Sequence, residues 1–241
     1  MLDDFMKDVF GKKIITWFKK NAKFLMVILI YFLYQSNFLL LIANNLGIKI
    51  ALLSRNLRML TLITNDLIYI IILVMLFIKD IKFGLKDLKN NFSIRALLSV
   101  KCWVIGCLIM TISSLLISIL IKQNLSTNEE LVRKQITLAP FYMLFACSIV
   151  APIIEEMVFR KSLSGLIKCK WLFILVSGLG FGLLHVISSY SNPLEFLYII
   201  PYGSMGCAFA YLLTKTNNIT LPIIIHMIHN TVLVLSQIYG G

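Results

Sequence analysis

Residues 138–160 read LAPFYMLFACSIVAPIIEEMVFR, and this stretch decides the fold. It is long enough to cross a hydrocarbon core of about 30 Å, for which a helix needs about 20 apolar residues. Lipid offers backbone groups no hydrogen-bond partners, so such a run must be helical. The same run carries Glu155 and Glu156. An ionisable group in a membrane core costs about 2.5–3.5 kcal/mol, which makes these carboxylates functional candidates.

Six further apolar runs of similar length accompany this stretch. They lie near residues 24–44, 60–78, 97–121, 171–190, 194–214 and 219–238. Hydrophobic residues make up 59% of the 241-residue chain and its mean hydropathy is +0.88, whereas a soluble domain is about 45–50% apolar. The alternating pattern of barrel strands is absent. We expect an all-α polytopic membrane protein of about seven (six to eight) transmembrane helices, with the catalytic core in the last four.

Three regions follow along the chain: a basic amphipathic segment over 1–23, N-terminal transmembrane helices over 24–130, and a catalytic core over 135–241. In the first region aromatic and aliphatic residues alternate with lysines. That pattern fits a helix on an anionic membrane surface and equally a basic flank that orients the first span. No small-residue cleavage site follows the first apolar run, so we expect it to be retained as a span. The five cysteines show no metal-site spacing and are expected to be packing thiols.

Charge sets the expected orientation. The formal net charge is +12, but the basic residues lie mostly between apolar runs, so membrane topology explains them better than nucleic-acid binding. Sixteen Lys and Arg residues fall on the side shared with the N-terminus and six on the other. The sequence predicts a multi-pass cell-membrane protein with a cytoplasmic N-terminus and an external C-terminus. Its partners are the lipid bilayer and a membrane-bound substrate, with no nucleic acid.

Polar residues of the last spans share helix faces. Glu156 and Arg160 are four residues apart, which lets them neutralise each other. Glu155 is turned about 100° away and is free to face another partner. His226 and Asn230 are also four residues apart and can reach one site together. His229, which lies on the other side of His226, can join that site or remain outside it.

Depth in the membrane supports the same grouping. At 1.5 Å per residue, Glu155 and His185 each lie about 21–24 Å from the turn near Cys169. Antiparallel helices therefore place them at one level. His226 reaches that level if the 161–170 hairpin projects by about 10 Å beyond the neighbouring turn. The expected site opens on the hairpin side, toward the cytoplasm.

Three motifs resemble the CPBP family of intramembrane proteases, which includes the type II CAAX prenyl endopeptidases and bacterial relatives sometimes called Abi proteins. The family pattern is EExxxR, FxxxH and HxxxN. This chain has EEMVFR at 155–160, FGLLH at 181–185 and HMIHN at 226–230, in that order and each within an apolar run. The resemblance covers about residues 135–240, whereas the first 130 residues match only in being membrane-spanning.

The resemblance implies an α-helical intramembrane endopeptidase that acts on a membrane-associated peptide or protein. By motif position, Glu155 is the residue that activates water and His185 assists it. His226 and Asn230 hold a metal or stabilise the oxyanion.

The resemblance also assigns Glu156 and Arg160 as a supporting pair. A divalent metal such as zinc, with His185 and His226 among its ligands, is one reading of the motifs. A glutamate general base with a His/Asn oxyanion hole is the other. No HExxH sequence is present, so a standard zincin site is excluded. Of the two readings we favour the metal-free glutamate mechanism.

Two other functions compete with proteolysis. The first is a bacteriocin-immunity or peptide-binding regulatory protein that keeps the fold without catalysis, against which the retained motif residues argue. The second is a small transporter with carboxylates as proton carriers, against which the lack of internal symmetry argues. Frequent Leu, Ile, Lys and Asn suggest a low-GC bacterial source. A precursor peptide or membrane protein is then a better substrate than a prenylated one.

Overall fold

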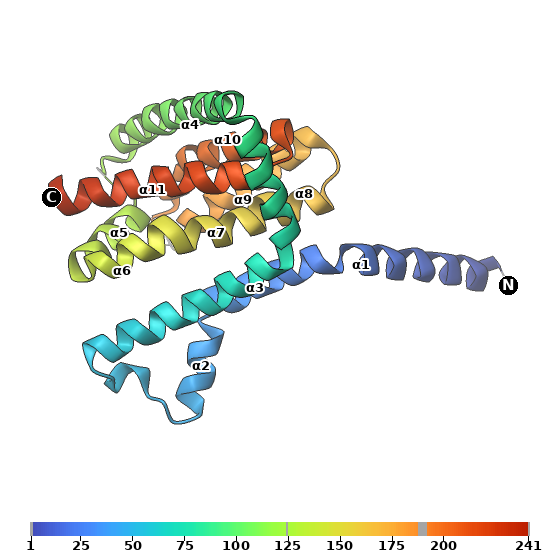
Figure 1. Ribbon diagram of the computed structural model, residues 1–241, viewed down its shortest axis with the longest axis horizontal. Helices are drawn as coiled ribbons and strands as arrows, with labels where there is room; N and C mark the ends of the chain where they lie inside the picture. Colours follow the sequence, from blue (N-terminus) through green and yellow to red (C-terminus); the bar gives the residue numbers. More distant parts are fainter. Residues whose placement is uncertain (1, 124, 188–191, 241) are drawn as a thin grey trace.

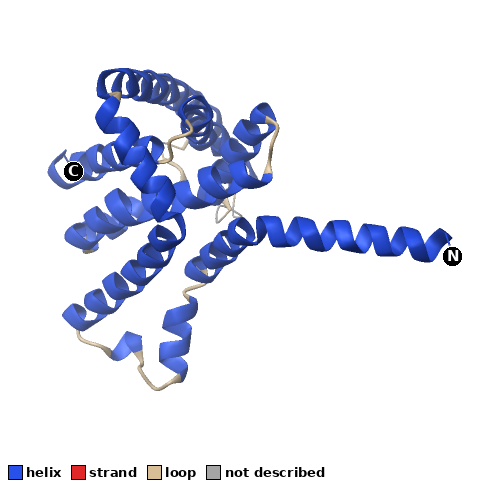
Figure 2. Cartoon of the chain, turned by 45° about the vertical axis from the view of Figure 1, so that its right-hand side comes forward, coloured by secondary structure: helices blue, strands red, loops and turns tan. Residues whose placement is uncertain are grey.

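The computed structural model describes residues 2–123, 125–187 and 192–240, with side chains from Lys13 onward. Every regular element within these ranges is helical and none is a strand, which confirms the all-α class (Figure 2). The α-helices are α1 (Leu2–Gln35), α2 (Phe38–Asn45), α3 (Arg55–Asn90), α4 (Phe92–Ile121), α5 (Thr127–Leu138), α6 (Pro140–Phe145), α7 (Ala151–Glu155), α8 (Leu163–Leu166), α9 (Lys170–Val186), α10 (Ile199–Thr216) and α11 (Thr220–Gly240). The 3₁₀ segments η1 (Ile50–Leu52) and η4 (Pro193–Tyr198) and the π-helical segments η2 (Ala146–Val150) and η3 (Glu156–Ser162) complete the described elements.

Each apolar run predicted from the sequence coincides with a helical segment. Five helical segments of the described chain are long and apolar enough to cross a membrane, or six when the pair α1–α2, bent by 55°, counts as one span. The count meets the lower end of the predicted range, and the protein is a multi-pass membrane protein. The run 171–190 corresponds to α9, which has 17 residues; its predicted end, 188–190, lies outside the described residues.

The chain termini and the connections between helices lie at two opposite ends of the bundle (Figure 1). Figure 1 shows the N-terminus and α8 at one end, and the C-terminus and α5 at the other. This arrangement matches the alternation expected from the charges. Helix α1 extends away from the bundle, and its residues 13–20 are exposed. The amphipathic character of 1–23 stays a prediction, because the side chains of residues 1–12 lie outside the described part.

Helices α1, α3 and α6 meet at a buried carboxylate that the sequence analysis did not single out. Asp66 is only 3% exposed. Its oxygens accept hydrogen bonds from the hydroxyls of Tyr34 (3.2 Å) and Tyr142 (3.1 Å). Its position in an apolar run was the available signal, since an ionisable residue there needs partners.

Glycines bring α9 and α10 into close contact. A Cβ atom at Gly182 would lie 2.6 Å from the Ile199 carbonyl oxygen, and one at Gly206 would lie 2.9 Å from the Gly178 Cα. Small residues at such crossings let two membrane helices approach until their backbones touch. This crossing fixes the rotation of α9, and with it the direction of Phe181 and His185.

The turn between α10 and α11 is held by two asparagines. Asn217 ends α10 in the left-handed conformation (φ 50°), which asparagine tolerates better than most residues. The Asn218 side chain is fully buried. Its Oδ1 accepts from the Thr220 backbone N–H at 3.0 Å, while its Nδ2 donates to the Gly84 carbonyl at 2.9 Å. These bonds begin α11 at a fixed height against α3.

Candidate active site

The helix that carries the two glutamates is interrupted by two π-helical segments, η2 before Glu155 and η3 after it. π-Turns add a residue to a helical turn, leave carbonyls unpaired and occur often at functional sites. Two side chains satisfy carbonyls of η3. The Ser177 hydroxyl donates to the Phe159 carbonyl at 2.7 Å, and the Ser162 hydroxyl donates to the Met157 carbonyl at 2.9 Å. The irregular backbone around the glutamates is therefore compensated by hydrogen bonds from polar side chains.

The same irregularity explains the position of Asn230. The Ala151 N–H bonds to the Ala146 carbonyl, and Pro152 has no N–H. The Cys147 carbonyl thus lacks both of its helical donors. The Asn230 Nδ2 supplies the missing bond at 2.9 Å. Asn230 consequently clamps α11 to the helix just before Glu155, and one of its two amide hydrogens is already in use.

Glu156 and Arg160 form the predicted pair. Arg160 Nε lies 3.1 Å from Glu156 Oε2, and both side chains are fully buried. The guanidinium carbon of Arg160 stands 4.6 Å from the ring centre of Phe181 and 5.5 Å from that of Phe209. A buried charge needs such compensation, because the desolvation of an unpaired ion costs several kcal/mol.

His226 contacts both glutamates, which the sequence analysis did not foresee for Glu156. Its Nδ1 lies 2.9 Å from Glu156 Oε1, and its Nε2 lies 3.8 Å from Glu155 Oε2. Glu156 thereby orients the imidazole in addition to pairing with Arg160. Glu155 is the less buried carboxylate, with 17% of its side chain exposed, against 0% for Glu156. Glu155 is the one that lines the cavity described next.

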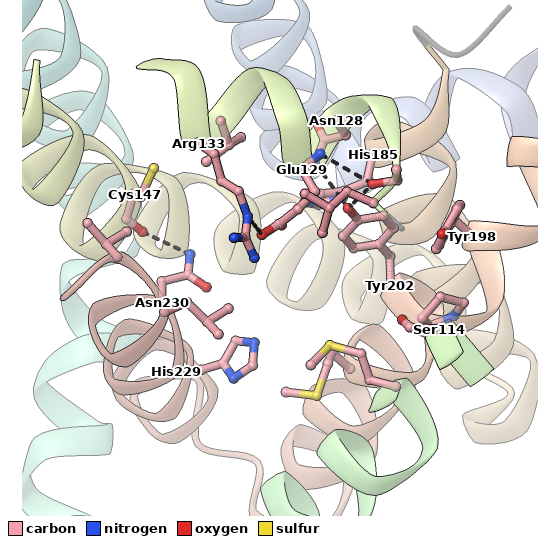
Figure 3. A pocket seen from close by; sticks show the side chains of 18 of the residues that line it. Ser114, Asn128, Glu129, Arg133, Cys147, His185, Tyr198, Tyr202, His229 and Asn230 are labelled. Atoms are coloured by element: carbon pink, nitrogen blue, oxygen red, sulfur yellow. Dashed lines mark hydrogen bonds and ion pairs between the residues drawn. The ribbon is translucent and has the colours of Figure 1, made fainter. Parts of the chain in front are cut away.

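All four residues predicted to be catalytic line one cavity of about 700 Å³. Figure 3 shows His185, His229 and Asn230 around it. The structure therefore brings Glu155, His185, His226 and Asn230 together from α7, α9 and α11. It adds His229, which the sequence analysis left open. Their catalytic roles stay predictions at this point.

His185 is held by its neighbours on two sides. Its Nδ1 lies 2.9 Å from the Phe181 carbonyl oxygen, one turn earlier in α9. Its ring stacks on Tyr202, with 4.6 Å between centroids and 22° between planes. The Tyr202 hydroxyl lies 2.9 Å from Ser126 Oγ and accepts from Asn128 Nδ2 at 3.3 Å. Tyr202 thus connects the site to the start of α5 and was missed by the motif analysis.

The cavity extends toward α5, at the end of the bundle opposite the 161–170 hairpin. Glu129 and Arg133 of α5 line it (Figure 3). Gln237, near the end of α11, lines it as well. The expectation that the site opens on the hairpin side is therefore wrong. The physical reason is that η3 packs Glu156, Arg160 and their neighbours into a closed layer on that side, with exposures of 0% for both. Which end faces the cytoplasm stays a prediction.

The described part of the site places only two candidate metal donors close together. Within the described ranges, no three His, Cys, Asp or Glu side chains are placed to share a metal ion. The pair Glu155–His226 offers two donors, whereas catalytic zinc sites use three protein ligands. His185 turns its Nδ1 to a carbonyl, as noted above. The described side chains therefore place two such donors together, and the assignment of His185 and His226 as metal ligands stays a prediction.

Comparison with known proteins agrees with these motifs. Residues 137–232 match the family model described as type II CAAX prenyl endopeptidase Rce1-like. The chain is 33% identical over 116 residues to the putative membrane peptidase YdiL of Bacillus subtilis, covering 47% of this chain and 44% of that protein. It is 33% identical over 138 residues to the membrane-embedded CAAX protease MroQ of Staphylococcus aureus, covering 54% and 52%. The chain thus spans about half the length of these relatives. No solved structure matches it.

Proposed function

We propose that the chain belongs, through residues 137–232, to the Rce1-like family of type II CAAX prenyl endopeptidases and that it is an intramembrane endopeptidase. Its substrate is a membrane-associated peptide or protein. One observation carries the proposal: a partly exposed carboxylate, Glu155, lies at the wall of a cavity of about 700 Å³ that three imidazoles also line. Peptide hydrolysis requires a base for water and polar groups for the carbonyl, and both are present there.

In the proposed reaction Glu155 takes a proton from water as the water oxygen attacks the peptide carbonyl carbon. His185 assists by accepting, at Nε2, a hydrogen bond from the second O–H of that water, because its Nδ1–H points to the Phe181 carbonyl. Glu155 then passes its proton to the amide nitrogen, the C–N bond breaks, and a carboxylic acid and an amine leave. General base catalysis of this kind contributes about 10²–10⁴-fold to a rate.

His226 and Asn230 support the reacting groups. The His226 imidazole, fixed by Glu156, brings its Nε2 to 3.8 Å from Glu155 Oε2, beside the water that Glu155 activates. Asn230 keeps one amide hydrogen beyond its bond to Cys147, and we propose that it points to the developing oxyanion. The cavity extends to α5, and we propose that substrate reaches Glu155 from that end of the bundle.

The second candidate, a peptide-binding or immunity protein, keeps the cavity but needs no base. Glu155→Gln separates the two, because it preserves size and removes the base. The purified protein is reconstituted in liposomes with a library of fluorogenic peptides, each containing one hydrophobic membrane segment. Cleavage is measured by fluorescence and mass spectrometry.

We expect Glu155→Gln to lower the cleavage rate at least about 100-fold. Glu130→Gln, on the exposed face of α5 and outside the cavity, serves as the matched control and should cleave normally. Full cleavage by Glu155→Gln, or peptide binding without cleavage by the wild type, would contradict the proposal.

A further inference from the structure

The three histidines of the chain differ in which ring nitrogen is available to the cavity. The Nδ1 of His185 faces the Phe181 carbonyl, which only accepts. The Nδ1 of His226 faces a carboxylate oxygen of Glu156, which is paired with Arg160 and accepts as well. Both Nδ1 atoms therefore carry hydrogen. In their neutral forms these two imidazoles present a bare Nε2, which can accept a hydrogen bond but cannot donate one.

His229 has the opposite arrangement. The Trp103 Nε1 donates to its Nδ1 at 3.1 Å. An indole N–H is only ever a donor, so the Nδ1 of His229 must be bare. The hydrogen of the neutral ring is then on Nε2. The two rings meet nearly edge to face, at 75°, and Trp103 comes from α4.

The free nitrogen of His229 belongs to the cavity. His229 is 9% exposed and lines the same cavity as Glu155. Its Nδ1 side is occupied by α4, where the Cys107 sulfur also lies 3.9 Å from Nδ1. The N–H of Nε2 therefore points away from α4, and Figure 3 shows the ring directed into the cavity.

We propose that the His229 Nε2–H binds the carbonyl oxygen of the scissile peptide, and that Trp103 fixes the tautomer that makes this possible. The inference rests on the proposed endopeptidase function. His229 is the cavity imidazole that can donate while neutral, and with the second amide hydrogen of Asn230 it forms a two-donor oxyanion hole. Trp103 is a positioning residue, because it acts through His229.

This division of roles has a chemical reason. His185 and His226, whose Nε2 atoms carry no hydrogen in the neutral rings, are suited to accept hydrogen bonds from water beside Glu155. An oxyanion needs donors whose geometry is set before the charge appears, and removal of one such donor typically lowers kcat by about 10²–10³-fold. A tryptophan donor achieves this without adding charge to an apolar site.

The first test is spectroscopic and needs no substrate. In full-length protein labelled with ¹⁵N-histidine in lipid nanodiscs, one histidine should show the neutral Nε2–H signature, and the signal should disappear in His229→Gln. Trp103→Phe should convert that histidine to a mixture of tautomers. A His229 that carries its hydrogen on Nδ1 in the wild type would overturn the proposal, whether or not any variant folds.

The second test is kinetic and uses the best-cleaved fluorogenic peptide of the library above. His229→Ala should lower kcat about 100-fold with little change in KM. The amide of His229→Gln can place an N–H near the position of Nε2, so kcat of this variant should be at least about tenfold higher than that of His229→Ala. Cys169→Ala, at an exposed cysteine outside the cavity lining, is the control and should leave kcat unchanged.

The outcomes separate the two proposals. If Glu155→Gln is inactive while His229→Ala keeps kcat within threefold of the wild type, the His229 donor is refuted and the endopeptidase stands. If Glu155→Gln is fully active, the proposed function itself fails. If His229→Gln loses as much as His229→Ala, with normal thermal unfolding of both, the N–H donor role is refuted.

Discussion

Replacing Glu156 by Gln leaves a single positive charge in the closed layer of the bundle. Glu156 and Arg160 are both 0% exposed and lie 3.1 Å apart. Removing one partner of a buried pair costs about 3–5 kcal/mol, because the remaining ion loses its compensation. The Gln oxygen can still accept from His226, so the cost falls mainly on Arg160. For a chain of this size, each kcal/mol shifts Tm by about 2–4 °C. The expected fall is about 6–20 °C.

The assay follows thiol exposure in detergent with a maleimide dye on heating, which the free cysteines make possible. Glu156→Gln/Arg160→Met removes both charges and should regain most of the lost Tm. Glu130→Gln is the control, because that carboxylate is exposed. A Tm for Glu156→Gln within 1 °C of the wild type, together with no gain in the double variant, would refute the reasoning about the buried pair.

Three further predictions concern the geometry around the site. Gly182→Ala places a Cβ 2.6 Å from the Ile199 carbonyl oxygen. It should destabilise the folded protein by about 1–3 kcal/mol and strongly lower the cleavage rate. Gly240→Ala is the control, because no neighbour lies within 4 Å of a Cβ at that position. Pro152→Ala restores a backbone N–H that can bond to the Cys147 carbonyl in place of Asn230. In a double-mutant cycle measured by thermal unfolding, Asn230→Ala should therefore lower the free energy of unfolding by about 1 kcal/mol less in the Pro152→Ala background than in the wild type. Strictly additive effects of the two substitutions would contradict the role of Asn230 as a clamp. Chelators should leave cleavage within about twofold, since the described residues place two metal donors together where catalytic zinc uses three; activity lost to a chelator and restored by zinc would establish a metalloprotease.

The spacing of the motifs correctly predicted which residues lie together at the site. Glu155, His185, His226 and Asn230 come from three separate helices, yet all line one cavity. The reason is that residues on regular helices keep a known face, and ionisable groups in lipid must face one another. The Glu156–Arg160 pair was predictable on the same basis, from its four-residue spacing.

Regular-helix geometry failed where the helix is not regular. A turn of 100° between neighbours predicted that Glu155 and Glu156 face different partners, but His226 contacts both. The π-helical segments η2 and η3 change the register on either side of Glu155. Depth estimates at 1.5 Å per residue are affected in the same way, and the predicted opening on the hairpin side was wrong as well.

The amino-acid sequence by itself determined that this chain is helical, crosses the membrane repeatedly, and places carboxylates and imidazoles in its last spans. Those properties follow from local composition, because lipid imposes them on any apolar run. Tertiary structure alone decided what each polar group does. Trp103 is 126 residues from His229, and Cys147 is 83 residues from Asn230. Hydrogen-bond partners so far apart in the chain select the tautomer of one side chain and occupy the amide of the other, and no local pattern encodes them.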